Sequence, residues 1–318
     1  MQTRMNKIAA FLLAGVFVFN CAKDGDQAAD NNSDNRTAAA SSANWEKVVA
    51  GLNFPEGPAW DGESTLYFSN CYGGWITALS NGQADTFLTA RESPLTFNKT
   101  NGMVFHQGSL FACDFGLGAI LKISKEGVIN TCAKEYQGKP FNRPNDLAFD
   151  ASGNLYFTDP KSYSREVLDG RIFLVKPDQK IEMLADSLGF PNGIAFSPDR
   201  KKLYVCESAF ERILRFDVAP GDGLTNKEVF IVLPGGDPDG IDFDREGNLY
   251  AAHFGGGAVY VITPDGVIRE KILTPGKKPT NIEFGGEDLK TLFLTEVETN
   301  ALYQRRVEFA GLVAKATQ

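Results

Sequence analysis

The chain has 318 residues, of which 43% are hydrophobic, and carries a formal net charge of -8 at pH 7. This length and composition allow a large buried core, and the acidic balance argues against nucleic acid or an anionic membrane surface as the main partner. The two histidines, His106 and His253, are too few for a histidine-rich zinc site.

The first 43 residues follow the pattern of an export signal and a linker. Arg4 and Lys7 precede an apolar run over residues 8–19, too short for a mature membrane span. Cys21 follows, as in a bacterial lipoprotein signal, although Asn20 departs from the small residue usual there. We expect a signal peptide over residues 1–20, a lipidated Cys21, and a flexible tether up to residue 43. The protein would then be exported and lipid-anchored to a bacterial membrane, facing the periplasm or the cell surface. An ordinary secretory peptide is the alternative.

After a first predicted strand over residues 45–50, a hairpin pattern recurs six times. Its clearest copy, residues 143–159, has two runs of alternating apolar residues joined by a turn rich in Asp, Ser, Gly and Asn. The copies begin at steps of 42 to 47 residues, and their leading residues are Glu56, Asn101, Asn145, Asn192, Asp239 and Asn281. A period of this length predicts a repeat architecture.

Two further strands follow most of the hairpins, which gives four strands per unit. The sixth unit has a third strand over residues 302–307 but little sequence after it. We therefore predict an all-β, six-bladed propeller over residues 44–318, with four antiparallel strands per blade. The strand over residues 45–50 would complete the last blade and close the ring.

This fold places the six leading residues around one end of the central channel. The residues that end the second strands should form a wider ring on the same face: Asn70, Asp114, Asp159, Glu207, His253 and Glu296. Asn-Gly and Asp-Gly pairs could also serve backbone turns alone. Glu56 and Asp239, however, would repel each other near a narrow axis unless a cation lay between them. Carboxylate and amide oxygens are the ligands of a hard cation, best met by Ca²⁺.

Five segments carry a resemblance to the senescence marker protein/gluconolactonase (regucalcin-like) family, covering about residues 45–310. They are Glu-Gly-Pro-Ala-Trp from residue 56, Arg-Pro-Asn-Asp from 143, Phe-Pro-Asn-Gly from 190, Pro-Asp-Gly-Ile from 238 and Pro-Thr-Asn-Ile-Glu-Phe-Gly-Gly from 279. Each segment alone is a weak signal, and the five in this order are specific. The chain would be a lipoprotein member of a family of six-bladed propellers with one divalent cation in the channel.

Carried over position by position, the resemblance makes Glu56, Asn192 and Asp239 metal ligands. It makes Asn145 a residue that contacts the metal or the substrate, and Arg143 a substrate-binding residue. The implied cofactor is one divalent cation, Ca²⁺ first, with Zn²⁺, Mn²⁺ or Mg²⁺ as alternatives.

Other positions carry weaker expectations. Asn101 matches a family Asn-Gly with no role to transfer, and residues 160–163 do not match the glutamate that helps to hold the sugar in the animal lactonase. His253 is expected to be a hydrogen-bonded rim residue, and His106 to face solvent in a hairpin turn. The cysteines after Cys21 are expected to be free thiols, although one disulfide stays possible in an exported protein.

The function we predict is that of a metal-dependent, gluconolactonase-like hydrolase acting on a sugar-type lactone. The cation would polarise the carbonyl group, and Asp239 would activate water or attack directly as a nucleophile. A phosphotriesterase-like hydrolase, similar to diisopropyl fluorophosphatase, and a non-catalytic binding propeller are the alternatives. The expected partner is a small-molecule lactone, with no nucleic acid, membrane contact only through the lipid anchor, and a monomeric protein.

Overall fold

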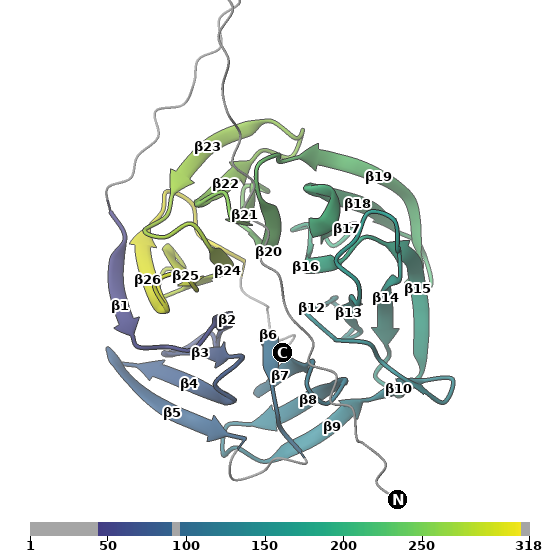
Figure 1. The fold of residues 1–318 in the computed structure, drawn as a ribbon, viewed down its shortest axis with the longest axis horizontal. Coiled ribbons are helices and arrows are strands. Elements are labelled where there is room, and N and C mark those ends of the chain that lie inside the picture. The colour runs from purple at the N-terminus through teal and green to yellow at the C-terminus, as the bar shows by residue number, and fades with distance from the viewer. Residues whose placement is uncertain (1–43, 91–95, 313–318) are drawn as a thin grey trace, which may run out of the picture. The chain divides into compact units, whose positions relative to one another are not determined.

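The computed structural model describes residues 44–90 and 96–312, which form six four-stranded antiparallel sheets around a common axis (Figure 1). The first three blades are β2 (Pro55–Trp60), β3 (Thr65–Asn70), β4 (Trp75–Ser80) and β5 (Gln83–Thr89); β6 (Thr100–His106), β7 (Ser109–Asp114), β8 (Ala119–Ser124) and β9 (Ile129–Ala133); and β12 (Leu147–Phe149), β13 (Leu155–Asp159), β14 (Gly170–Val175) and β15 (Ile181–Leu188). The other three are β16 (Pro191–Phe196), β17 (Lys202–Glu207), β18 (Arg212–Val218) and β19 (Leu224–Val232); β20 (Asp237–Phe243), β21 (Leu249–Phe254), β22 (Ala258–Ile262) and β23 (Ile268–Leu273); and β24 (Pro279–Gly285), β25 (Thr291–Glu296), β26 (Ala301–Arg306) and β1 (Glu46–Ala50). The predicted six-bladed propeller is confirmed.

The alternating pattern of the second strands packs each blade against both neighbours. In β13, Leu155 and Phe157 join the apolar cluster that reaches back to Phe111 of the second blade. Tyr156, between them, joins the cluster that reaches forward to Phe196 of the fourth. Both faces of such a strand are buried, and complete burial of one side chain such as Phe157 contributes roughly 2 kcal/mol. The core therefore lies between the blades.

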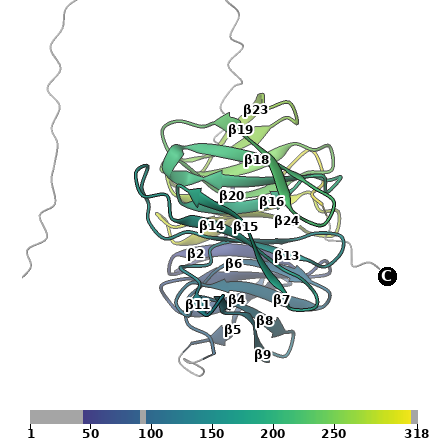
Figure 2. The ribbon, with the colours of Figure 1, turned by 90° about the vertical axis from the view of Figure 1, so that its right-hand side faces the viewer.

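The two ends of the described chain meet in the last blade. β1 pairs antiparallel with β26, with Glu46 opposite Gln304 and Ala50 opposite Ala301. The six inner strands also contact one another in a closed cycle, β2–β6–β12–β16–β20–β24–β2. The predicted closure of the ring by the first strand is confirmed, and only the outer strand of each blade remains as a sheet edge. Figure 2 shows the ring from its side, with β23 at the top of the view and β5 and β9 at the bottom.

Short elements interrupt the regular repeat. A two-stranded hairpin of β10 (Glu135–Tyr136) and β11 (Lys139–Pro140) precedes the third blade, and a 3₁₀ turn, η1 (Ser208–Phe210), follows β17. His106 does not face solvent as expected. It is half-buried, and its ring stacks on Phe149 of the next blade at a centroid distance of 3.8 Å.

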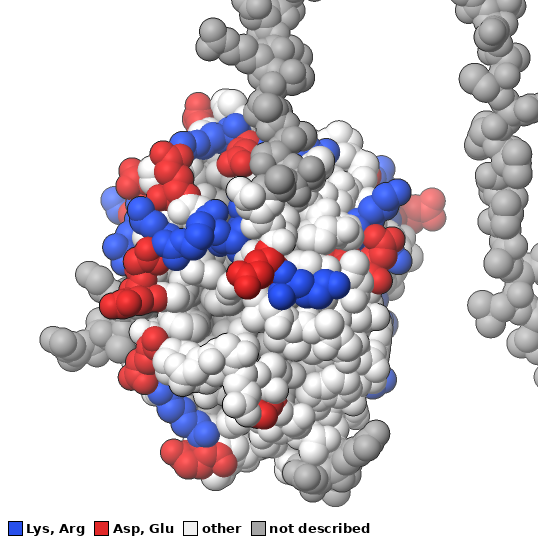
Figure 3. Space-filling model, turned by 90° about the vertical axis from the view of Figure 1, so that its left-hand side faces the viewer, with Lys and Arg blue, Asp and Glu red and all other residues white. Residues whose placement is uncertain are grey.

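The surface mixes charges of both signs. On the side shown in Figure 3, basic and acidic side chains lie next to one another. Examples on the outer strands and turns are Arg269 with Glu308 at 2.8 Å, and Arg306 with Asp288. Exposed pairs of this kind contribute little to stability.

The predictions about cysteines concern the described propeller, whereas those about membrane anchoring concern the first 43 residues. Cys71, Cys113, Cys132 and Cys206 are free, as expected. Within the described residues, no helix is long and apolar enough to cross a membrane. The predicted signal peptide, Cys21 and the tether lie outside the described residues.

Candidate active site

A cavity of about 190 Å³ opens where the inner strands begin. It brings together the five propeller residues predicted as metal ligands or substrate-binding residues, Glu56, Arg143, Asn145, Asn192 and Asp239, and also Asn101. These residues come from five different blades. Each lies just before its inner strand or in the first residues of it, so the six-fold repeat of the sequence becomes a convergence of polar side chains at one end of the channel.

Irregular pairing at the start of the inner strands accompanies this convergence. The register between the first two strands shifts between Glu56 and Ala59, between Thr100 and Met103, between Pro191 and Ile194, and between Pro238 and Ile241. A bulge re-aims side chains next to it, which is why bulges are common beside active sites. Here the shifts fall at or beside Glu56, Asn101, Asn192 and Asp239.

The glycines after the leading residues serve close packing of the inner strands around the channel. A Cβ atom on Gly57 would lie 2.1 Å from the carbonyl oxygen of Asn101, and one on Gly193 would lie 2.1 Å from that of Asp239. Only a residue without a side chain allows the neighbouring strand so near. Gly57 and Gly193 lie inside β2 and β16, so these two glycines serve packing between strands and do not form turns.

Asn281 does not join the other five leading residues, which corrects the expectation for the sixth blade. Its side chain lines a second cavity at the other end of the inner strands. The Asn281 Oδ1 atom accepts the N–H of Ile282 at 2.8 Å and lies where a Cβ atom on Gly240 would be. Asn281 therefore fills the seam between β20 and β24.

Glu56 and Asp239 are buried carboxyl groups in the same cavity, exposed by 5% and 8%. Burial raises the pKa of Glu56 to about 8, against a hydrogen bond from the Gly57 N–H that lowers it. Burial, and then the charge of Glu56, raise the pKa of Asp239 well above its usual range, while a side-chain hydrogen bond with Asn192 lowers it. Neither carboxylate forms an ion pair within the described part of the chain. Burial thus favours the protonated form of both groups, and a cation bound between them would stabilise the two carboxylates.

The residues present fit a hard divalent cation. Glu56 and Asp239 offer anionic oxygens, and Asn145 and Asn192 offer neutral amide oxygens. Cys71 also lines the cavity, but burial raises the pKa of its thiol well above the usual value, and its Sγ donates to the carbonyl oxygen of Thr100. Within residues 44–90 and 96–312, no group of three or more His, Cys, Asp or Glu side chains is placed to hold a metal. A cation here would therefore need the amide oxygens.

The outer ring fixes the loops that enter the inner strands. Asp159 accepts the N–H groups of Asn142 and Arg143 at 3.0 and 2.8 Å and pairs with Arg171. Asp114 accepts the N–H groups of Asn98 and Lys99, Glu207 that of Gly189, and Glu296 that of Lys278. These buried carboxylates lie at the ends of second strands, as predicted, and their role is to position the loops.

His253 has a related structural role. It is 1% exposed and does not line the cavity, and its Nε2 atom lies 2.9 Å from the carbonyl oxygen of Leu233. Burial lowers the pKa of the ring, which favours the neutral form. The expectation of a hydrogen-bonded residue is therefore met, with the difference that His253 is buried beneath the rim.

Several residues of the cavity were not predicted. They are the side chains of Phe54, Tyr72, Phe115, Pro160, Tyr163, Phe190, Ser208, Asp237 and Phe254. Five of them lie within a blade, one or two residues after the outer-ring positions Asn70, Asp114, Asp159, Glu207 and His253: Tyr72, Phe115, Pro160, Ser208 and Phe254. The repeat therefore carried a signal for these positions. Asp237 could also have been predicted, because it lies two residues before Asp239 on β20 and side chains two residues apart on a strand point to the same face.

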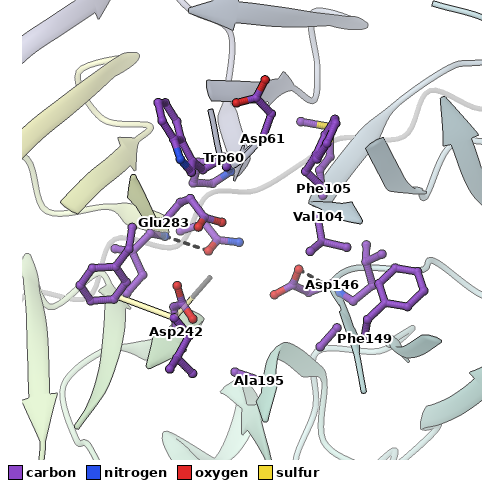
Figure 4. Close-up of a pocket in the computed structure, with 18 of the residues that line it drawn as sticks. Trp60, Asp61, Val104, Phe105, Asp146, Phe149, Ala195, Asp242 and Glu283 are labelled. Carbon is purple, nitrogen blue, oxygen red and sulfur yellow. Dashed lines mark hydrogen bonds between the residues drawn. The ribbon is translucent and has the colours of Figure 1, made fainter. Parts of the chain in front are cut away.

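The opposite end of the channel holds a larger cavity of about 310 Å³. Figure 4 shows Asp146, Asp242 and Glu283 pointing into it. Burial raises the pKa of Asp146 and of Asp242 to about 7, and that of Glu283 well above its usual range. Arg200 lines the same cavity and lowers the pKa of Asp242. None of these three carboxyl groups was predicted from the sequence to form a site.

The chain is similar to several known proteins. The model of the SMP-30/Gluconolactonase/LRE-like region matches residues 54–298. Gluconolactonase of Zymomonas mobilis is 35% identical over 221 residues, which cover 62% of this chain and 60% of the relative. Diisopropyl-fluorophosphatase of Loligo vulgaris is 32% identical over 212 residues, which cover 61% and 67%.

Solved structures agree on the fold. A gluconolactonase from Xanthomonas campestris superposes with a TM-score of 0.73 at 29% identity, covering 83% of this chain and 89% of that one. Regucalcin from Agrobacterium tumefaciens, described as a calcium-binding protein, has a TM-score of 0.72 at 23% identity, covering 85% and 95%, and supports the fold alone. Because the family model covers most of the propeller, the chain belongs to the SMP-30/gluconolactonase family.

Proposed function

We propose that this protein is a metal-dependent hydrolase that opens a lactone of the sugar-acid type. The observation that carries the proposal is the convergence of Glu56, Asn145, Asn192 and Asp239 in one cavity, with Arg143 at its edge. The family supports the reaction class, and relatives named gluconolactonase, 6-deoxy-6-sulfogluconolactonase and pentonolactonase all act on lactones by name.

Glu56, Asn145, Asn192 and Asp239 would hold the divalent cation, Ca²⁺ first. The cation, when bound, supplies Lewis acidity that stabilises the negative charge developing on the lactone carbonyl oxygen. Arg143 is exposed, and its backbone is fixed by Asp159. Its planar donors would therefore hold substrate oxygens at the mouth of the cavity.

Asp239 is the residue we assign to the attacking water. Its carboxylate would orient the water and accept its proton. The hydrogen bond with Asn192 fixes one side of the group. Direct attack by Asp239 on the carbonyl carbon is the alternative, and it would form an acyl-enzyme ester that water then hydrolyses.

The test is turnover of glucono-δ-lactone and galactono-γ-lactone by protein freed of metal with EDTA and then supplied separately with Ca²⁺, Mg²⁺, Mn²⁺ or Zn²⁺. Activity that EDTA abolishes and one of these cations restores supports the proposal. The same samples should be tested on diisopropyl fluorophosphate, because the Loligo relative carries that activity in its name. Turnover of the phosphoester and of no lactone would favour the phosphotriesterase alternative.

We also propose the arrangement of the whole chain: a signal peptide over residues 1–20, a lipidated Cys21, a tether to residue 43, and a monomeric propeller held at a bacterial membrane. The apolar run before Cys21 and the polar stretch after it support this. Mass spectrometry of the mature N-terminus from the native host tests it. An unmodified Cys21, or cleavage elsewhere, contradicts the anchor.

A further inference from the structure

The polar floor of the candidate active site consists of Glu56, Asn101, Asn145, Asn192 and Asp239. Six aromatic side chains surround it. This aromatic rim consists of Phe54, Tyr72, Phe115, Tyr163, Phe190 and Phe254. The rings lie in contacting groups, with Phe54 and Tyr72 at a centroid distance of 4.6 Å, Tyr72 and Phe115 at 6.4 Å, and Tyr163 and Phe190 at 5.5 Å. The space above the proposed metal ligands is therefore bounded mainly by apolar surface.

Two of these rings are unusually exposed. Tyr72 is 56% exposed and Tyr163 is 57% exposed. They are the only aromatic residues among the exposed large hydrophobic side chains of residues 44–90 and 96–312. Both line this one cavity. Exposed apolar surface that gathers at a cavity mouth marks a place where a ligand is bound.

Several polar groups around the rim already have partners. The Tyr163 hydroxyl donates to Asp237 Oδ1 at 2.7 Å, and the Ser208 hydroxyl donates to the carbonyl oxygen of Pro238 at 2.8 Å. Arg143 is the one positively charged residue of the lining, and its guanidinium lies over the Phe115 ring, 5.6 Å from the centroid. Above the amide and carboxylate floor, the groups that remain to bind hydroxyls are the Arg143 guanidinium, the Tyr72 hydroxyl and the second oxygen of Asp237.

We propose that the lactone hydrolysed with the highest kcat/KM at this site carries an apolar substituent, aromatic or aliphatic. The substituent would lie on the part of the lactone ring that points toward the aromatic rim. This inference rests on the proposed lactone hydrolysis, and it departs from the sugar-type substrate of that proposal. The lactone group would sit on the polar floor, Arg143 would contact its oxygens, and the substituent would lie between the Tyr72 and Tyr163 sides of the rim.

The physical reason is that hydroxyl substituents and apolar substituents differ in the free energy of moving from water to the aromatic rim. A hydroxyl group that loses water and finds no partner is disfavoured, and a fully hydroxylated six-membered lactone brings several such groups to the rim. An alkyl or aryl substituent gains by leaving water and packing against rings. We expect this difference to change kcat/KM by about tenfold or more.

The experiment compares four lactones that share a six-membered ring: δ-valerolactone, glucono-δ-lactone, δ-decalactone and 5-phenyl-δ-valerolactone. Full-length protein loaded with the cation that gives the highest activity is used, and each kcat/KM is divided by the spontaneous hydrolysis rate of that lactone. We expect δ-decalactone and the phenyl lactone to exceed the other two by about tenfold. Glucono-δ-lactone as the best substrate would overturn the inference and leave the proposed function standing. Failure of all four with every cation would instead overturn the proposed function.

Variants locate the preference at the rim. Tyr163→Ala should lower kcat/KM for the phenyl lactone about tenfold more than for δ-valerolactone. Tyr163→Phe keeps the ring and loses the bond to Asp237, and should retain the preference. An equal loss in both variants would overturn the role of the ring. Val267→Ala, which shortens a side chain 57% exposed on the turn before β23, is the matched control and should leave all four rates unchanged.

Discussion

The two ends of the channel are both acidic and buried, yet they differ in what surrounds the carboxyl groups. At the start of the inner strands, Glu56 and Asp239 share a cavity with three asparagine side chains. At the other end, Asp242 accepts the N–H of Phe243 at 2.7 Å and faces Arg200. Asp146 likewise accepts the N–H of Leu147 at 2.9 Å.

This difference shows that acidity alone does not define a metal site in a propeller. Carboxyl groups at both ends have raised pKa values, so these values do not separate the near end, the cavity of Glu56 and Asp239, from the far end, the cavity of Asp146, Asp242 and Glu283. The far end differs because the Arg200 guanidinium lowers the pKa of Asp242 and because it has one asparagine side chain, Asn281, in place of three. The near-end pair has amide oxygens beside it and no ion-pair partner within the described residues. We therefore expect an external cation, and with it the chemistry, at the near end.

The sharpest test compares two carboxylates on one strand. Asp239→Ala should reduce lactone turnover about a thousandfold or more, because it removes a cation ligand and the group assigned to the water. Asp242→Asn, three residues along β20 and at the other end, should change turnover by less than about fivefold. Steady-state kinetics with saturating Ca²⁺ measures both, and circular dichroism checks the fold. Equal losses in the two variants would refute the assignment of chemistry to the near end.

Metal removal should affect stability through the near end alone. A cation that binds only the folded protein stabilises it by about 2.7 kcal/mol at a hundred times its Kd. We expect Ca²⁺ to raise the melting temperature of the wild type, to have no such effect on Asp239→Ala, and to retain its effect in Asp242→Asn. Calorimetry in Ca²⁺ and in EDTA measures this. Retained Ca²⁺ affinity in Asp239→Ala would remove Asp239 from the ligand set.

The far end should control how stability depends on pH. Burial raises the pKa of Asp242 from 3.8 to about 7. The charge of Arg200 lowers this pKa, and the charge of Asp244 raises it. The folded state thus keeps its proton to higher pH than the unfolded chain, and this carboxyl group makes the protein less stable as pH rises between those two values.

Asp242→Asn removes that loss, since an amide does not ionise. Its stability relative to the wild type should increase by about 2 kcal/mol between pH 4 and pH 8, an effect moderated by partial exposure of the side chain. Urea unfolding in EDTA measures the difference at each pH. Glu283 and Asp146 face the same cavity and are present in both proteins. A stability difference between the two proteins that does not change with pH would show that the pKa of Asp242 is not raised in the folded state.

The smallest effect is expected at the mouth of the near end. Arg143→Ala should raise KM about tenfold and lower kcat less, because an exposed guanidinium that holds substrate oxygens acts equally in the ground and transition states. Arg143→Lys is the control that keeps the charge and loses the planar donors. A change confined to kcat would assign Arg143 to the transition state instead.

The sequence alone determined the number of blades, the closing strand and five of the six leading residues, because a period of 42 to 47 residues repeats local strand and turn signals. The repeat placed Glu56, Asn145, Asn192 and Asp239 at one end of a closed ring, and the resemblance to the family singled them out among the leading residues. The tertiary structure decided what no period records. Asn281 turns into the seam against Gly240, Asp146, Asp242 and Glu283 gather at the far end, and the rings of Tyr72 and Tyr163 converge from separate loops. Such contacts join residues from different blades, and their geometry depends on bulges and side-chain packing that local sequence patterns do not specify.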